Sequence, residues 1–318
     1  MKKLLLSIVC VMFTVFVYGQ ENKTVTKRLE AKYGFVVYHD NDGGWYSVSR
    51  ESYGKESGVC DAYGREIIPL IWDNVMFFGK YYKVEKNGFV GIRDLSNKEL
   101  VSCRYTNVYW HQTEDYNGYC EVEINGKKGI IDKNNKEVAP CKYDDISVYS
   151  LKNGSVCEVK ISNKIGIYDV EQRRELIPCT KYTAVRWYQK KSYNGYCEVE
   201  INGKKGVVDK SNYEVIPCDY DDISIHELKK SSSCNVKKNG KTGVFDIKEG
   251  KEILPCTKYT EVRWWQKREY GGFCEVAIDG KYGVIDRNNK EVVPCQYDKT
   301  YFTNLKENAF CEVEFNGK

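Results

Sequence analysis

The sequence predicts an all-β fold made of tandem β-meander or hairpin repeats, each about 38 residues long. One pattern recurs along the chain: Cys-Glu-Val, a turn, Lys-x-Gly-x-x-Asp, a second turn, and Glu-x-x-Pro-Cys-x-Tyr. Apolar and charged residues alternate in each copy, as in residues 120–124, which is typical of half-buried strands. We find no helical periodicity after residue 20 and expect no helix longer than two turns. An open curved array and a propeller-like arrangement both fit this pattern.

The repeats come in pairs. A shorter and a longer interval alternate between successive copies of the Val of Cys-Glu-Val, so that a double unit overlies the single one. The double unit shows in the equal spacing of Cys120, Cys197 and Cys274. Residues 116–133 and 193–210 differ at only two positions, which indicates duplication of a two-repeat block. Repeat arrays form surfaces more readily than they form one asymmetric catalytic pocket, so we do not expect an enzyme.

Residues 1–20 are predicted to be a signal peptide. Lys2 and Lys3 precede an apolar run at residues 4–17, which has the length typical of a secretion signal. We therefore expect an exported protein, periplasmic, surface-bound or secreted, with no membrane span. Cys10 lies inside the apolar run, whereas a lipid-anchor cysteine ends such a run, so we do not expect lipidation.

The rest of the chain is expected to form one array. Residues 21–57 are predicted to be an irregular β segment or first partial repeat, and residues 58–318 the regular repeats. The last repeat is incomplete at the Asn316-Gly317 turn. Either the array closes onto its N-terminal segment or the chain ends early, and we favour an early end. Acidic and basic residues are interleaved around a net charge of +4, so we expect no nucleic-acid partner.

Turn residues separate the predicted strands. Pairs such as Asn125-Gly126 favour type I′ hairpins, in which both central residues have a positive φ. The Asp three residues after each anchor Gly is expected to accept hydrogen bonds from the following turn. A third strand begins at Glu137 and is broken by Pro140, and residues 143–149 are predicted to be a fourth short strand or edge. The predicted structural anchors are Gly129, Asp132, Gly166, Asp169, Gly206, Asp209, Gly243, Asp246, Gly283 and Asp286.

The Asn-Gly-Lys-x-Gly-x-x-Asp and Glu-x-x-Pro-Cys-x-Tyr-Asp motifs resemble the WG-repeat (KWG-type) proteins of bacteria, over about residues 45–318. The resemblance implies tandem β-rich repeats in an exported protein of a Bacteroidota-like organism, and it implies no catalytic residues. The Trp that gives the family its name is replaced here by Val90, Lys128, Ile165, Lys205, Thr242 and Tyr282.

Thirteen cysteines follow the predicted signal peptide. Apart from Cys60 they form a Cys-Glu-Val series (120, 157, 197, 234, 274, 311) and a Pro-Cys series (103, 141, 179, 218, 256, 295). Their spacing matches no Cys-x-x-Cys zinc pattern, and we expect neither metal nor cofactor. Buried free thiols and disulfides both remain open, and we favour thiols because Cys120 shares a face with Val122 and Ile124, away from Glu121 and Glu123.

The residues for nucleophilic catalysis are not arranged in a recognisable motif. A cysteine nucleophile needs a histidine partner, and His39, His111 and His226 occupy different repeat contexts. Adjacent carboxylates such as Asp144 and Asp145 should point to opposite faces of a strand, so they are poor acid–base pairs.

Three longer segments before Cys-Glu-Val are the predicted recognition feature. They are aromatic-rich loops, one in each double unit, and the candidate ligand-binding residues are Trp110, His111, Trp187, Tyr188, Trp264 and Trp265. For the recurring Trp110, Trp187 and Trp264 we favour packing between neighbouring sheets over ligand contact. In a strand, His111, Tyr188 and Trp265 should then point to the opposite face, which makes them the better ligand candidates.

The sequence therefore predicts a non-catalytic, exported β-repeat protein that binds an unknown macromolecular partner, a protein or an envelope glycan. The alternative is a structural spacer without a specific ligand. An enzyme is the least favoured class.

Overall fold

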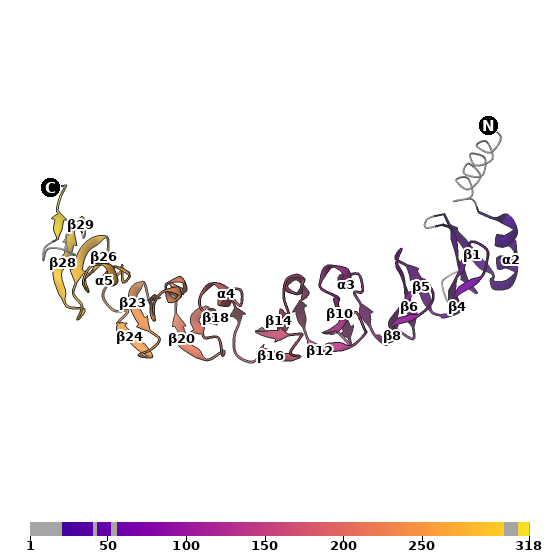
Figure 1. Ribbon diagram of the computed structural model, residues 1–318, viewed down its shortest axis with the longest axis horizontal. Coiled ribbons are helices and arrows are strands. Elements are labelled where there is room, and N and C mark those ends of the chain that lie inside the picture. Colours follow the sequence, from indigo (N-terminus) through magenta and orange to yellow (C-terminus); the bar gives the residue numbers. More distant parts are fainter. Residues whose placement is uncertain (1–20, 41–42, 52–55, 302–310, 318) are drawn as a thin grey trace, which may run out of the picture. The chain divides into compact units, whose positions relative to one another are not determined.

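The computed structural model describes residues 21–40, 43–51, 56–301 and 311–317, so the predicted signal peptide lies outside the described residues. Figure 1 labels the elements and colours them along the sequence. The chain divides into two compact units. Unit 1 comprises Met1–Glu158 and Asp169–Arg174, and unit 2 comprises Val159–Tyr168 and Glu175–Lys318.

The described residues form seven antiparallel sheets of four consecutive strands each and one two-stranded sheet. This confirms the all-β repeat fold predicted from the sequence. The first three sheets consist of β1 (Phe35–His39), β2 (Trp45–Ser49), β3 (Ser57–Asp61) and β4 (Glu66–Trp72); β5 (Asn74–Phe77), β6 (Tyr81–Lys86), β7 (Phe89–Asp94) and β8 (Glu99–Tyr105); and β9 (Asn107–Val108), β10 (Tyr119–Ile124), β11 (Lys127–Asp132) and β12 (Glu137–Tyr143).

The next two sheets consist of β13 (Asp145–Ser147), β14 (Val156–Ile161), β15 (Lys164–Asp169) and β16 (Arg174–Ile177); and β17 (Ala184–Val185), β18 (Cys197–Ile201), β19 (Lys204–Val208) and β20 (Glu214–Tyr220). The remaining sheets consist of β21 (Asp222–Ile223), β22 (Ser233–Lys238), β23 (Lys241–Asp246) and β24 (Lys251–Leu254); β25 (Glu261–Val262), β26 (Cys274–Ile278), β27 (Lys281–Ile285) and β28 (Glu291–Tyr297); and β29 (Lys299–Tyr301) with β30 (Glu312–Glu314).

The short strand after each Cys-x-Tyr motif opens the next sheet. β21 follows Tyr220, and its Ile223 pairs with Val236 of the Cys-x-Val strand β22. The strand expected within residues 143–149 is likewise β13, the first strand of its sheet and not a fourth strand of the preceding one. The repeat length predicted from the sequence is therefore correct, but the predicted boundary between repeats is wrong by one strand.

Pro140 does not break its strand, contrary to the sequence-based expectation. β12 runs through Pro140 to Tyr143, and its register against β11 shifts twice, as in a β-bulge. A proline is tolerated here because β12 lies at the edge of its sheet and the bulge removes the need for a regular hydrogen bond. In the repeats that carry one extra residue after Pro-Cys, β16 and β24 end immediately before the proline.

Both predicted turn types are confirmed. Asn125 and Gly126 have φ values of 50° and 75°, and the equivalent Asn-Gly or Asp-Gly pairs also take a positive φ at both residues. Asp132 Oδ1 accepts hydrogen bonds from the backbone N–H groups of Asn134 and Lys136, at 2.9 and 3.0 Å. The other anchor Asp residues accept equivalent bonds: Asp169, Asp209, Asp246 and Asp286. Each anchor Gly in β11, β19, β23 and β27 pairs with the Val of Cys-x-Val.

The expectation that no helix exceeds two turns is wrong. α2 (Lys23–Tyr33) has 11 residues and begins at Asn22, whose side chain accepts bonds from two backbone N–H groups of the first turn. Its Leu29 and Tyr33 are buried against Tyr46 and Val48 of the first sheet. The four-residue spacing of Val25, Leu29 and Tyr33 is a helical signal that the strand pattern of the rest of the chain obscured.

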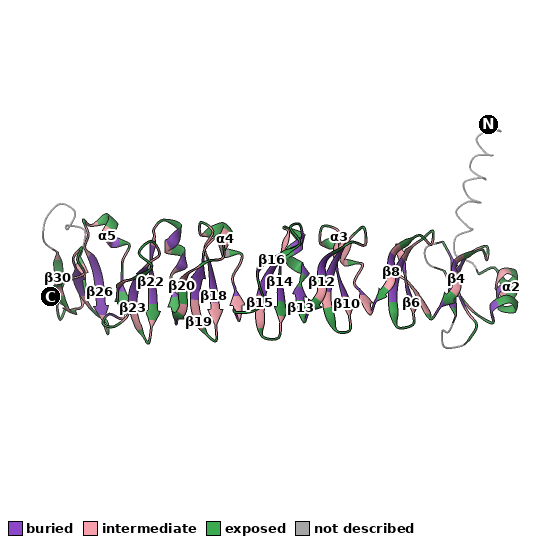
Figure 2. Cartoon of the chain, turned by 90° about the horizontal axis from the view of Figure 1, so that it is seen from below, coloured by how far each residue is buried: buried purple, intermediate pink, exposed green. Residues whose placement is uncertain are grey.

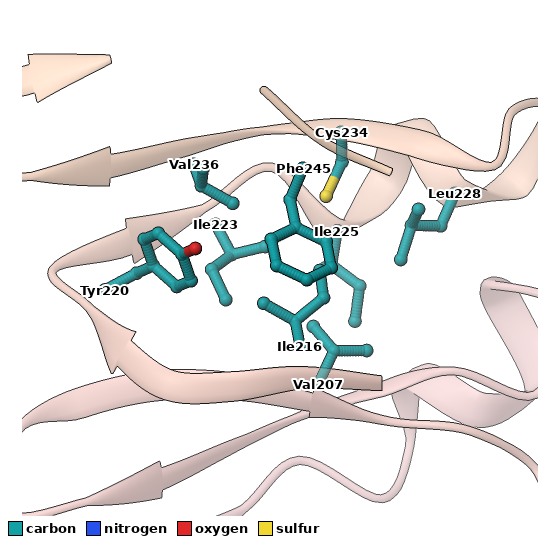
Figure 3. Packing of buried hydrophobic residues seen from close by; sticks show 9 residues of the cluster. All are labelled: Val207, Ile216, Tyr220, Ile223, Ile225, Leu228, Cys234, Val236 and Phe245. Carbon is teal, nitrogen blue, oxygen red and sulfur yellow. The ribbon is translucent and has the colours of Figure 1, made fainter. Parts of the chain in front are cut away.

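The core lies between successive sheets. In the cluster of Figure 3, Val207, Ile216 and Tyr220 of one sheet pack against Ile223, Val236 and Phe245 of the next, together with Ile225, Leu228 and Cys234. The ring centroids of Tyr220 and Phe245 are 6.2 Å apart in an edge-to-face arrangement. Buried residues follow the central strands, whereas the turns at their ends are exposed (Figure 2).

Stacking of the sheets buries both faces of the central strands, which corrects the prediction of half-buried strands. Glu121 was expected opposite the apolar face, yet its exposed fraction is only 6%. Lys128 Nζ lies 3.2 Å from its carboxylate, and burial raises the pKa of Glu121. Glu198 and Glu275, its counterparts in the later double units, are equally buried and pair with Arg186 and Arg263.

Candidate recognition surface

The loop between the first and second strands of each sheet lies at the end opposite the Asn-Gly hairpin. We call the loops at residues 78–80, 109–118 and 148–155 the loop row of unit 1, and those at residues 186–196, 224–232 and 263–273 the loop row of unit 2. The longer ones contain one-turn helices, α3 (Gln112–Asp115), α4 (Gln189–Ser192) and α5 (Gln266–Glu269). The shorter ones that follow β13 and β21 contain 3-10 turns, η1 (Val148–Lys152) and η2 (Ile225–Lys229).

The recurring tryptophans are half-buried at the base of these loops. Trp110 packs against the buried cluster that includes Val108 and Cys120, and Trp264 packs against the one that includes Val262 and Cys274. Trp264 Nε1 also donates to Ser233 Oγ at 3.1 Å, and the Lys267 ammonium lies 4.1 Å from the Trp264 ring centroid. The shorter loops place buried Val148 and Ile225 at the same position. These contacts favour packing as the role of the recurring Trp.

The residue after each Trp points outward. Tyr188 and Trp265 are 71% and 45% exposed, and His111 is also exposed. They do not lie in strands, as the sequence argument assumed: His111 and Trp265 have helical backbone angles at the start of α3 and α5. The side chains of His111, Tyr188 and Trp265 nevertheless point away from the core, as predicted.

Sequence reasoning missed three further rings at this place. Tyr149 in η1 is 74% exposed, His226 in η2 is exposed, and Phe78 in the short loop after β5 is 50% exposed. Each is the third residue after the apolar residue of the first strand, for example after Ile223 for His226. We call this place the ring position. Counting from the first strand, and not from Trp, is the signal that would have identified it.

A glutamine fastens the long loops at residues 109–118 and 263–273 to the second strand of their sheets. Gln112 Oε1 accepts the backbone N–H of Glu121 at 2.8 Å, and buried Gln266 accepts that of Glu275 at 2.7 Å. In η2, Glu227 replaces glutamine and accepts the N–H of Asn235 at 2.8 Å. The ring position is thus held next to a residue fixed to the central strand.

Neighbouring loops are also linked within each unit. In unit 1, Asn117 Nδ2 donates to the carbonyl of Leu151 at 2.8 Å. In unit 2, Asn194 Nδ2 donates to the carbonyl of Lys229 at 2.9 Å, and Arg268 Nη1 donates to that of Lys230 at 2.6 Å. These bonds make each set of loops a continuous, ordered surface.

Two lysines anchor the long loops of unit 2 to the turns beside them. Lys190 Nζ donates to Asn212 Oδ1 at 2.8 Å, and Lys267 Nζ donates to Asn289 Oδ1 at 2.7 Å. Burial lowers the pKa of both lysines. Their ammonium groups serve the structure of the loops and are not free for a partner.

Each unit has a hollow between two neighbouring loops. In unit 1, a cavity of about 620 Å³ is lined by Phe78, Lys80, Trp110, His111 and Glu114. In unit 2, a cavity of about 250 Å³ lies between η2 and α5, and its lining includes His226, Lys229, Lys230, Trp264, Trp265 and Arg268. In both, a residue at the ring position of a long loop faces the preceding loop.

The cysteines and the adjacent carboxylates of the described residues have structural surroundings. No three His, Cys, Asp or Glu side chains in this part of the chain converge to hold a metal ion. The cysteines are unpaired thiols, and burial raises the pKa of Cys120 and Cys274 to about 12, which disfavours the nucleophilic thiolate. Asp144 and Asp145 are engaged in ion pairs with Lys127 and Lys128. None of the helices in the described residues is both long and apolar enough to span a membrane.

Comparison with known proteins identifies the repeat. Residues 129–164 and 282–318 match the family described as WG containing repeat. A search of curated proteins found no match.

Solved structures with some similarity include dihydro-heme d1 dehydrogenase NirN in complex with DHE, at 14% identity over 83% of this chain and 66% of that chain, with a TM-score of 0.26. A eukaryotic initiation factor has 10% identity, 85% coverage of both chains and a TM-score of 0.25. Kluyveromyces lactis Hsv2p has 10% identity over 79% of this chain and 92% of that chain, with a TM-score of 0.24.

Proposed function

Because this chain is a WG-repeat-containing protein, we propose that it is a non-catalytic binding protein in which the loop row of a unit contacts a macromolecular partner, a protein or an envelope glycan. The observation that carries this proposal is the exposed ring at the same loop position in successive sheets: His111 and Tyr149 in unit 1, and Tyr188, His226 and Trp265 in unit 2.

Rings on a fixed scaffold suit such a role. Aromatic side chains offer a large contact area with few rotatable bonds, so little conformational entropy is lost on binding. The hydrogen bonds from Gln112, Gln266 and Asn194 order the loops before any partner arrives. Such pre-organisation reduces the free-energy cost of association.

Export is part of the proposal. It rests on Lys2, Lys3 and the apolar run at residues 4–17, which have the form of a secretion signal. An exported array meets envelope proteins and glycans, and this choice of partner classes follows from the proposed location.

The experiment is recovery of partners from envelope extracts with the immobilised chain. A variant with His111, Tyr149, Tyr188, His226 and Trp265 changed to Ala should lose the partner and keep its melting midpoint. The matched control changes Ile71 and Phe89, exposed apolar residues near the hairpin ends of their sheets, and should behave as the unmodified chain.

Equal recovery by the ring variant and the unmodified chain would refute the proposal. The absence of any partner for the unmodified chain would favour the structural spacer, the alternative function considered from the sequence.

A further inference from the structure

The loop row of unit 2 combines its rings with exposed cations. Lys191, Lys229, Lys230 and Arg268 are all exposed on α4, η2 and α5. Within the described part of the chain, none of these four forms an ion pair. Segments 189–195, 225–232 and 265–272 together hold six Lys or Arg residues against two carboxylates, Glu227 and Glu269. This local excess of positive charge is not evident in the sequence, because strand residues separate the three loops.

These cations surround the ring position. The unit 2 cavity brings Lys229, Lys230 and Arg268 together with the rings of His226 and Trp265. Arg268 uses one guanidinium nitrogen to bond the Lys230 carbonyl at 2.6 Å, which fixes its orientation. An oriented guanidinium is suited to a carboxylate or sulfate, because its planar N–H groups match two oxygens at once.

The equivalent cavity of unit 1 has a different charge. Glu114 occupies the loop position of Arg268, and Lys80 Nζ pairs with its carboxylate at 2.9 Å. α3 also carries Asp115 and no cation. The rings are common to both units, whereas the cavity of unit 2 is lined by three cations, Lys229, Lys230 and Arg268, against the single carboxylate of Glu227.

We infer that the unit 2 loop row binds an anionic polysaccharide, with sugar faces against Trp265 and Tyr188 and carboxylate or sulfate groups near Arg268, Lys229 and Lys230. This inference rests on the proposed function and specifies the chemistry of the partner. Flat, exposed rings provide stacking surfaces for the apolar faces of sugars, and the cations select polymers that carry negative charge.

Ring spacing favours a glycan over single-stranded nucleic acid. Packed sheets lie about 10 Å apart, and each offers one ring, so consecutive rings are too widely separated to stack consecutive bases. A regular polysaccharide helix presents the same face only at every second or third sugar and can therefore use separated platforms. The proposed export of the chain also favours a glycan over a nucleic acid.

The test measures affinity of the full chain for polygalacturonate and dextran sulfate, with unsulfated dextran as the neutral polymer and oligothymidylate as the nucleic acid. We expect binding to both anionic glycans, weakened by salt, and little binding to dextran. The triple variant K229Q/K230Q/R268Q should bind at least about tenfold more weakly, and its affinity should depend less on salt. The matched control K23Q/K27Q/K98Q removes the same charge from exposed positions in unit 1 and should change nothing.

W265A should weaken binding by about tenfold at every salt concentration, because it removes a stacking surface and not a charge. Thermal melting of each variant verifies that its loops still fold. Equal affinity for neutral dextran, tighter binding of oligothymidylate, or unchanged affinity of the triple variant would overturn the inference.

The two proposals can fail separately. If the ring variant loses an envelope partner while K229Q/K230Q/R268Q retains it, the proposed binding function stands. The inference that the partner is an anionic polysaccharide is then wrong. If neither variant loses the partner, both proposals are wrong.

Discussion

Cys141 lies directly over Gly129, so that a Cβ atom on the glycine would come 2.7 Å from the thiol sulfur. The same approach, at 2.6 to 2.9 Å, recurs for the anchor glycines at 91, 166, 206, 243 and 283. In five of the described repeats the thiol donates across the glycine to the carbonyl of the anchor Val, with sulfur–oxygen distances from 3.3 Å for Cys179 and Val159 to 3.9 Å for Cys103 and Val84. The Val, Gly and Cys of the repeat motif are therefore one contact group.

Gly206→Ala should lower the free energy of unfolding by about 1–3 kcal/mol, because its Cβ would lie 2.7 Å from both Cys218 Sγ and the Ile216 carbonyl oxygen. Adding Cys218→Ala should restore only part of this loss, since the backbone clash remains. Gly154→Ala is the control, because its Cβ would meet nothing closer than 3.8 Å. Denaturant titration of the unmodified chain and the three variants gives the comparison, and complete rescue by Cys218→Ala would contradict the backbone explanation.

Gly203→Val should destabilise the chain by about 1–3 kcal/mol through backbone strain alone. Gly203 has a φ of 82°, and a Cβ there would meet no atom within 4 Å, so the loss cannot come from a clash. Gly154→Val lacks the positive φ and should have a much smaller effect. Melting midpoints measure both changes, and equal values for the two variants would argue against the hairpin assignment.

The buried thiols should resist modification in the native chain and become reactive on unfolding, whereas most of the Pro-Cys series (Cys103, Cys141, Cys218, Cys256 and Cys295) is only half-buried, contrary to the expectation from the sequence. Cys120, Cys197 and Cys274 have an exposed fraction of 0%. A disulfide between the two cysteines of one repeat is disfavoured because β11 lies between β10 and β12, which separates their Cα atoms by roughly two strand spacings, or 9–10 Å. Mass spectrometry of the unreduced chain should find no loss of hydrogens. A deficit of about twelve hydrogens would mean six disulfides and would contradict the thiol state.

Stability should fall at alkaline pH. Burial raises the pKa of Cys120 to about 12 and of Cys197 to about 11, above the ordinary thiol value of about 9. A raised folded pKa contributes stability that is complete below pH 9 and is lost as the pH rises toward 11 or 12. Urea midpoints measured with reductant should therefore decline from pH 8.5 to 11. Cys197→Ala should have a shallower decline, and a flat profile for the unmodified chain would refute the burial argument.

The hydrogen bond between Tyr220 and Glu252 should contribute about 1.5–3 kcal/mol, because it joins a buried hydroxyl to a carboxylate. Tyr220 Oη donates to Glu252 Oε1 at 2.9 Å, from one sheet to the next. A double-mutant cycle with Tyr220→Phe and Glu252→Gln measures the coupling. Tyr213→Phe, at a 77% exposed side chain, is the control. A coupling energy near zero would show that packing alone joins the two sheets.

Much of the fold could be predicted because the repeat pairs local signals with a fixed spacing. The Asn125-Gly126 hairpin and the Asp132 turn depend on backbone preferences of neighbouring residues, and both predictions are confirmed. The burial of Glu121 could not be read in the same way, because it depends on the sheet that packs against its strand. Pro140 was misjudged for a related reason: its tolerance depends on an edge position and a bulge, which are features of pairing between strands.

The candidate surface was predicted only in part. The aromatic loops were visible because Trp recurs once in every double unit, but Tyr149 and His226 lie in loops without Trp and escaped notice. The cationic neighbours of Trp265 escaped because Lys229 and Arg268 belong to different repeats and meet only when successive sheets stack. Partner binding itself remains a prediction.

The two loop types alternate, and this restricts how the gene can change length. Asn194 lies in a long loop that contains a one-turn helix, and its side chain donates to the backbone of the 3-10 turn in the next loop. A loop of one kind therefore needs a loop of the other kind beside it. Unequal crossing-over that deletes or inserts a whole double unit preserves every such pairing, whereas a shift of one sheet would set two loops of the same kind side by side. The heritable unit of growth is therefore a pair of sheets, and any multivalent contact made by the rings would change in steps of two.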